Sequence, residues 1–124
     1  MYLFPLLKRE LRYNKCMKTK KLNYPIPFRG GELSIQGNSY AYCEPKSNKG
    51  PYFMLEVAHF NKDGNMVLIP EFKDRADDPD GKTVVHGWVT VERIKELLKS
   101  DGYTDENIEG IFDRINTVVR YDNV

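Results

Sequence analysis

The sequence is short of the residues and motifs from which most small catalytic sites are built. Its two cysteines, Cys16 and Cys43, lack the paired spacing of a zinc site and are too few for the disulfide framework of a small secreted protein. The glycines at 30–31 and at 81 lack the spacing of a phosphate-binding loop, and no GxSxG nucleophile elbow occurs. We therefore expect reduced thiols, a cytoplasmic location, no cofactor, and no nucleotide-driven or acyl-transfer chemistry.

Long apolar runs are also missing. The apolar opening, MYLFPLL, is broken by Pro5 and is followed by charged residues without a small-residue cleavage site, so we expect neither a signal peptide nor a membrane span. A chain of 124 residues is long enough to bury roughly two-thirds of its unfolded surface in one domain without a metal or a disulfide. We expect residues 1–21 to form a basic N-terminal arm or short helix and residues 22–124 to form a single domain.

Strands are predicted before helices along the chain. Pro25 and Pro27 favour an extended edge strand, because each proline removes a backbone donor. The turn residues at 37–38, with alternating residues on both sides, predict a hairpin in which Ile35 lies opposite Tyr40. Strands are expected at residues 24–28, 32–36, 39–43, 52–60, 65–69 and 83–89.

Two helices are predicted at the C-terminal end. Thr90 caps a helix over residues 91–100 that Gly102 ends, and Thr104 caps a second helix over residues 105–120. Both helices share an apolar stripe that should pack on the sheet, formed by Ile94, Leu97, Leu98, Ile108, Ile111, Phe112, Ile115 and Val119. The expected fold is α+β, with a mostly antiparallel sheet of about five to six strands and a C-terminal two-helix hairpin packed on it.

The predicted helical hairpin also resembles part of a known family. The segment from Val91 to Ile115, with the core LLKSDGYTDENIEGIF, resembles the first two helices of ubiquitin-associated domains, in which a hydrophobic helix, a glycine-aromatic loop and a second helix form a binding groove. The likeness covers about a fifth of the chain, and the family's third helix is missing. The resemblance therefore implies a helical hairpin, and no function is transferred from it.

Three residues are the candidates for reactive chemistry. In the predicted hairpin Cys43 lies opposite Glu32 and next to Glu44, and neighbouring carboxylates destabilise a thiolate, so we expect a structural cysteine. His59 and His86 lie on predicted strands as partly buried residues, without the HxH or HExxH spacing of a metal site. We predict no catalytic and no metal site. The alternative, a small enzyme or metal protein, requires the two histidines and Cys43 to meet in one pocket.

Charge is distributed unevenly along the chain. Residues 1–30 contain eight basic groups and one acidic group, whereas residues 31–124 contain 11 basic and 17 acidic groups. The basic arm either meets an anionic partner or lies on the acidic body of its own fold. Because aromatic residues are interleaved with its charges, nucleic-acid binding is one alternative function. The basic residues concerned are Lys8, Arg9, Arg12, Lys15, Lys18, Lys20, Lys21 and Arg29.

An acidic loop follows the predicted central strands. When Gly81 is placed at the invariant glycine of an EF-hand loop, the first ligand position falls on Ala76 and the twelfth on Gly87, and neither offers a side-chain oxygen. A solvated loop accounts better for the segment from Asp74 to Asp80, and an acidic patch offered to a basic partner is the remaining interpretation.

The expected function is therefore that of a small non-enzymatic binding or regulatory protein that acts on a larger macromolecule, with a protein as the expected partner. An inhibitor or accessory factor of the phage or mobile-element kind fits this size and this lack of motifs. Homodimerisation through the proline-marked edge is a further expectation. Besides the basic arm, the candidate contact residues are Tyr40, Tyr42, Tyr52, Asp77, Asp78 and Asp80.

Overall fold

The computed structural model describes residues 20–81 and 84–121, and in this part of the chain an antiparallel sheet is organised around strand β3 (Met54–Phe60). One edge of β3 pairs with β2 (Gly31–Gln36), which pairs in turn with β1 (Ile26–Phe28). The other edge pairs with β4 (Met66–Val67) at the C-terminal end of β3 and with β5 (His86–Thr90) nearer its N-terminal end. β3 is therefore central, as its apolar character on both faces predicts. The same pattern at 65–69 predicted a second central strand, and this is wrong, because β4 is two residues long and pairs with β3 alone.

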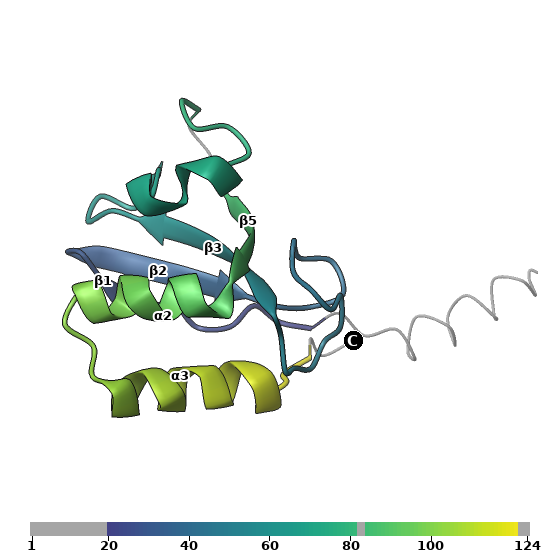
Figure 1. Cartoon of the computed structure of the whole chain (residues 1–124). Helices are drawn as coiled ribbons and strands as arrows, with labels where there is room; N and C mark the ends of the chain where they lie inside the picture. The colour runs from purple at the N-terminus through teal and green to yellow at the C-terminus, as the bar shows by residue number, and fades with distance from the viewer. Residues whose placement is uncertain (1–19, 82–83, 122–124) are drawn as a thin grey trace, which may run out of the picture.

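The predicted α+β class is confirmed, since in the described residues five antiparallel strands are followed by two C-terminal helices (Figure 1). The strand expected at 24–28 is the edge strand β1, where Pro27 lies opposite Glu32. The turn expected after β3 is also present, because Gly64 has a φ of 83° and its N–H donates to the carbonyl of Asn61 (2.9 Å). The basic arm or short helix expected at residues 1–21 lies outside the described part of the chain, apart from Lys20 and Lys21.

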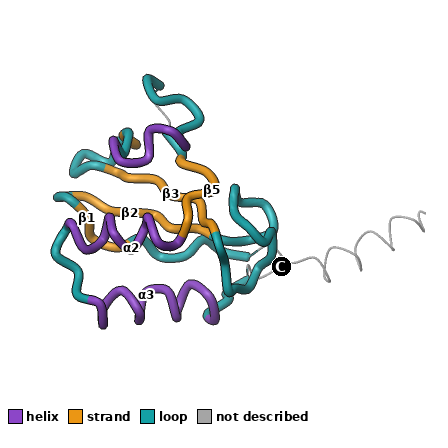
Figure 2. The backbone as a smooth tube through the Cα atoms, viewed as in Figure 1, coloured by secondary structure: helices purple, strands orange, loops and turns teal. Residues whose placement is uncertain are grey.

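The hairpin predicted around residues 37–38 is wrong. The second edge of β2 pairs with β3, so that Ile35 lies opposite Val57 and not opposite Tyr40. After β2 the side chain of Asn38 accepts hydrogen bonds from the backbone N–H groups of Tyr40 (2.8 Å) and Ala41 (2.7 Å), which turns the chain out of an extended conformation. Residues 37–53 therefore form a long loop, which lies beside β5 at one end of the sheet (Figure 2).

Both predicted helices are present. Thr90 caps α2 (Val91–Ser100) through its hydroxyl oxygen, and Thr104 caps α3 (Asp105–Thr117) in the same way. Gly102, at a φ of 94°, lies in the left-handed region that follows many helix C-termini. α3 ends three residues earlier than predicted, and the two helices run antiparallel in Figure 1.

A short 3₁₀ helix, η1 (Pro70–Arg75), was not predicted from the sequence. It begins with Pro70, whose missing donor costs nothing in a first turn, and it buries Phe72 against the sheet. The core joins the sheet to the helical hairpin through one cluster of buried side chains. Its members include Phe28, Leu33, Ile35, Leu55, Val57, Phe72, Val89, Ile94, Leu97, Leu98, Ile108, Ile111, Phe112 and Ile115.

Candidate binding surface

A bulge in β5 interrupts the regular pairing of the sheet. Between the pairs Leu55–Val89 and Val57–His86, β3 has one residue and β5 has two, Gly87 and Trp88. Trp88 has a φ of 51°, in the left-handed region that bulky side chains rarely adopt. Bulges of this kind redirect a side chain out of the regular alternation of a strand. The bulge therefore fixes the direction of Trp88, the chain's only tryptophan.

Trp88 stacks on Tyr42 from the 37–53 loop. The ring centroids are 4.9 Å apart and the ring planes differ by 21°, while the two residues remain 40% and 43% exposed. The backbone N–H of Trp88 donates to the Tyr42 carbonyl (2.9 Å), and the backbone N–H of Tyr42 donates to the Glu56 carboxylate (3.0 Å). A Cβ on Gly87 would lie 2.9 Å from the Tyr42 Cβ, so only glycine leaves room for this stack. The pair is thus an aromatic surface that is held by backbone hydrogen bonds and is partly open to solvent.

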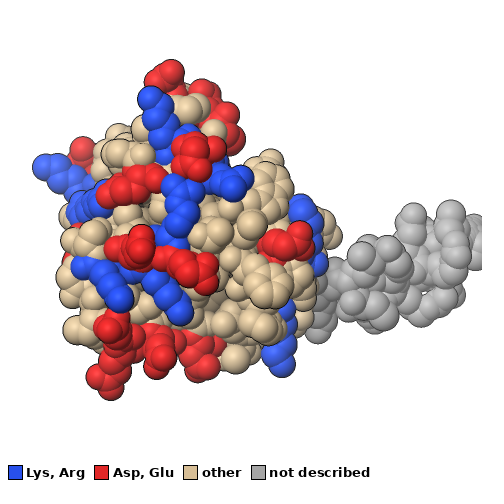
Figure 3. Space-filling view, in the orientation of Figure 1, with Lys and Arg blue, Asp and Glu red and all other residues tan. Residues whose placement is uncertain are grey.

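Two further exposed aromatic residues belong to the 37–53 loop, which also contains Tyr42. Tyr40 is 69% exposed and precedes Tyr42 by two residues, and Phe53 is 71% exposed. The backbone of Phe53 is fixed on both sides, since its N–H donates to the Glu44 carbonyl (2.8 Å) and its carbonyl accepts from Val91 (3.1 Å) at the start of α2. We name Tyr40, Tyr42, Phe53 and Trp88 the aromatic patch. Figure 3 shows largely uncharged surface over β5 and the adjacent loop, whereas charges of both signs cover η1 and α2.

The structure corrects the third predicted aromatic anchor. Tyr52 is only 5% exposed, and its hydroxyl lies 2.7 Å from the Ser47 carbonyl and 3.1 Å from the Gly37 carbonyl. Burial raises the pKa of Tyr52 to about 12. Tyr52 therefore holds the 37–53 loop together, and Phe53 and Trp88 are two exposed aromatics that the sequence did not indicate as contact residues.

Lys20 is not an exposed member of a basic arm. It is 5% exposed, its Nζ donates to the Gly37 carbonyl (2.6 Å), and burial lowers its pKa. Lys21 is exposed, as predicted. The other arm residues, Lys8, Arg9, Arg12, Lys15 and Lys18, lie outside the described residues.

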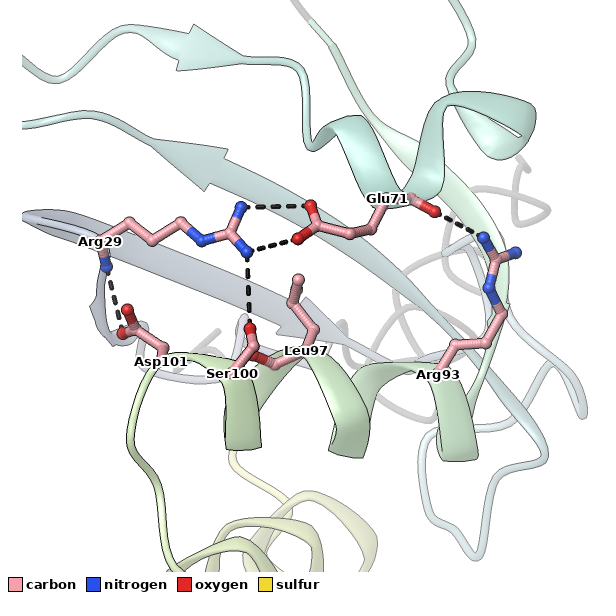
Figure 4. A network of polar contacts seen from close by, with 6 residues as sticks. All are labelled: Arg29, Glu71, Arg93, Leu97, Ser100 and Asp101. Atoms are coloured by element: carbon pink, nitrogen blue, oxygen red, sulfur yellow. Dashed lines mark hydrogen bonds and ion pairs between the residues drawn. The ribbon is translucent and has the colours of Figure 1, made fainter.

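Arg29 takes part in a network of polar contacts within the fold (Figure 4). Its guanidinium donates two hydrogen bonds to the Glu71 carboxylate and approaches Ser100, while its backbone N–H donates to Asp101 (3.2 Å). Arg93 donates to the Glu71 carbonyl (2.6 Å). The contact with Arg29 holds the pKa of the Glu71 carboxyl below its usual value. The network joins the β1–β2 turn, η1 and α2. Of the two interpretations of the basic residues, the contact with acidic residues of the same fold therefore applies to Arg29, which connects these elements.

The acidic loop is exposed, as predicted, and part of it has a structural role. Asp77 accepts a hydrogen bond from the N–H of Val85 (2.9 Å) and donates its own N–H to the Val85 carbonyl (2.9 Å), which closes the loop. Asp78 and Asp80 are exposed. Within residues 20–81 and 84–121, no group of three or more histidine, cysteine and acidic side chains is arranged to hold a metal ion.

The three candidate reactive side chains have separate structural contacts. The His86 ring is fully buried, accepts from the N–H of Ile69 (3.1 Å) and lies 2.9 Å from the Val57 carbonyl. His59 packs edge-on against Phe28, with ring centroids 5.0 Å apart. Burial lowers the pKa of both histidines.

Cys43 is buried as well. Its thiol lies 3.2 Å from the Asn38 carbonyl and 3.4 Å from the Pro45 carbonyl. These contacts support the prediction of a structural cysteine, although Glu32, its expected neighbour, pairs with Phe60 instead.

Comparisons with known proteins add no further identification. No family model matches the chain, and no curated protein or solved structure is significantly similar to it. None of the helices in the described ranges combines the length and the apolarity that crossing a bilayer requires.

Proposed function

We propose that this chain is a small non-enzymatic binding protein whose aromatic patch docks on a larger protein partner. The observation that carries the proposal is the left-handed backbone at Trp88, which costs about 1–2 kcal/mol and yet exposes the Trp88–Tyr42 stack to solvent. Backbone strain of this kind is concentrated at functional sites. Tryptophan and tyrosine are also the residues most enriched among binding hot spots.

The charges beside the patch favour a protein over a nucleic acid. The Glu56 carboxylate accepts a hydrogen bond from the backbone N–H of Tyr42, and Glu44, whose backbone carbonyl accepts from the N–H of Phe53, is exposed. The negative charges of these two residues would repel a phosphate backbone, and among the described residues Lys46, 5.9 Å from the Tyr42 ring centre, is the only cation over a ring of the patch. A cytoplasmic location belongs to the same proposal, because Cys43 is a buried free thiol, as is typical of proteins from reducing compartments.

Quantitative affinity purification from the native host tests the proposal. The full chain, its Tyr42→Ala variant and a Lys62→Ala control are immobilised in parallel. Lys62 follows the C-terminal end of β3, whereas the patch residue Phe53 precedes its N-terminal end, and the seven residues between these ends span about 20 Å. We expect at least one protein that the full chain and the control capture and that Tyr42→Ala loses.

Binding is then measured with the purified partner. Loss of a hot-spot aromatic should weaken affinity by roughly thirtyfold, and the emission of Trp88 should shift to shorter wavelength as the partner covers the ring. Equal capture of every protein by all three forms would show that the aromatic patch is not part of the binding surface. Salt-sensitive binding of RNA or DNA that Tyr42→Ala does not change would favour the nucleic-acid alternative instead.

A further inference from the structure

A cavity lies between the edge of the sheet and α3, on elements that do not contribute to the aromatic patch. Its volume is about 300 Å³. The apolar wall combines Ile26, Leu33 and Ile35 from the sheet with Ile111 and Ile115 from α3. A space of this size is at the lower end of the range for small-molecule sites, which are mostly apolar with a few placed polar groups.

Two arginines are among the other residues that line this cavity. Arg114 lies on α3 and is exposed, and Arg120 follows the helix. Among the described residues, neither arginine forms an ion pair or donates to a carboxylate. Arg120 is held in place, because it donates to the Leu22 carbonyl and its guanidinium lies 4.1 Å from the centre of the Tyr24 ring. The cavity thus has an apolar wall and two cations that retain unused donors.

We propose that the cavity binds a small amphipathic carboxylate, whose alkyl chain fills the space against Ile111 and Ile115 and whose carboxylate meets Arg114 and Arg120. The guanidinium group is suited to this role, since its donors match the two oxygens of a carboxylate. The cavity equals the liquid volume of about ten water molecules, so it fits a carboxylate of about ten non-hydrogen atoms. Octanoate has this size. The proposal is independent of the aromatic patch and concerns a second site.

Titration of the full chain with octanoate, followed through the isoleucine methyl resonances, tests the inference. We expect saturable shifts at Ile26, Ile111 and Ile115. n-Octanol has the same chain without the charge, and octyltrimethylammonium has the opposite charge. Octanol should bind at least about tenfold more weakly, because it lacks the charge-assisted hydrogen bonds, and the ammonium compound should not bind.

Arg114→Gln is the informative variant, because its exposed side chain can be changed without opening the core. It should weaken octanoate binding about tenfold and leave octanol binding unchanged. Arg75→Gln in η1, at the opposite end of the molecule from α3 (Figure 1), should leave both affinities unchanged. The inference is overturned if octanoate causes no saturable shift up to about 5 mM, an affinity at the weak end of the usual range. It is also overturned if octanol binds as tightly as octanoate, or if Arg114→Gln has no effect.

Discussion

Replacing Trp88 by alanine and by glycine separates the cost of its backbone from the contribution of its ring. Both variants remove the stack with Tyr42, so the stability lost with the ring is common to them. They differ in how well each residue tolerates a φ of 51°. Alanine retains the clash of its Cβ with the following carbonyl, whereas glycine has no Cβ.

The magnitude follows from two opposing terms. A non-glycine residue in the left-handed conformation costs about 1–2 kcal/mol. Glycine loses more freedom on folding and is usually less stable than alanine by roughly 0.5–1 kcal/mol. At Trp88 the first term exceeds the second, so we expect Trp88→Gly to be more stable than Trp88→Ala by about 0.5–1 kcal/mol. This order is the reverse of the usual one.

Urea denaturation followed by circular dichroism measures the difference. Glu32, an exposed residue of β2 without a positive φ, provides the matched control, and there the alanine variant should be the more stable of the two. A Trp88→Ala variant at least as stable as Trp88→Gly would refute the strained backbone on which the proposed function depends.

Further predictions concern α3, the polar network and the buried histidine. Gly110→Ala should raise the free energy of unfolding by about 0.5–1 kcal/mol, because the new Cβ meets no atom within 4 Å, and an unchanged or lower melting temperature would contradict this. A double-mutant cycle on Arg29 and Glu71 should give a coupling of about 0.2–1 kcal/mol at pH 7. The coupling should disappear in acid, because the pKa of Glu71 in the folded protein lies below its unfolded value of 4.5. The ionised carboxylate therefore stabilises the fold above pH 4.5, and this stabilisation is lost as the pH falls through the folded pKa. Burial lowers the pKa of His86 and of His59, so unfolding experiments should show stability falling as the pH drops below about 6.5, and His86→Gln should reduce that dependence and leave the part that His59 contributes.

The helical hairpin could be predicted because its signals are local. Thr90 and Thr104 each cap a helix with their own hydroxyl groups, and Gly102 adopts a conformation that few other residues tolerate. The strand β3 could also be predicted from its own residues, because an apolar pattern on both faces favours a buried strand. Its pairing with β2, β4 and β5 joins segments far apart in the chain, and the same pattern at 65–69 did not produce a central strand.

The hairpin around residues 37–38 was predicted wrongly because two pairings competed for one edge of β2. The local turn satisfies the usual sequence rules, yet pairing Ile35 with Val57 builds a core strand into the sheet. The side chain of Asn38 then satisfies the backbone of the loop that remains. Sequence rules for turns do not include this long-range competition.

The candidate site was predicted only in part for the same reason. Tyr42 was expected to be exposed, but its stacking partner was not identified, because the 83–89 segment indicated a regular strand without a bulge. The bulge exists because β3 and β5 differ by one residue between two fixed pairs. Likewise, Tyr52 and Lys20 are buried side chains that both donate to the Gly37 carbonyl, and this contact joins segments far apart in the chain.

The most direct test of the proposed function is the affinity of the purified partner for the Trp88→Gly variant. This variant relieves the backbone strain and removes the exposed ring, so a loss of affinity in the folded variant can be assigned to the missing ring and not to a damaged fold. We expect a folded protein whose affinity for the partner is reduced by roughly thirtyfold or more. A folded Trp88→Gly variant that binds the partner as tightly as the original chain would contradict the proposal that the aromatic patch is the docking surface.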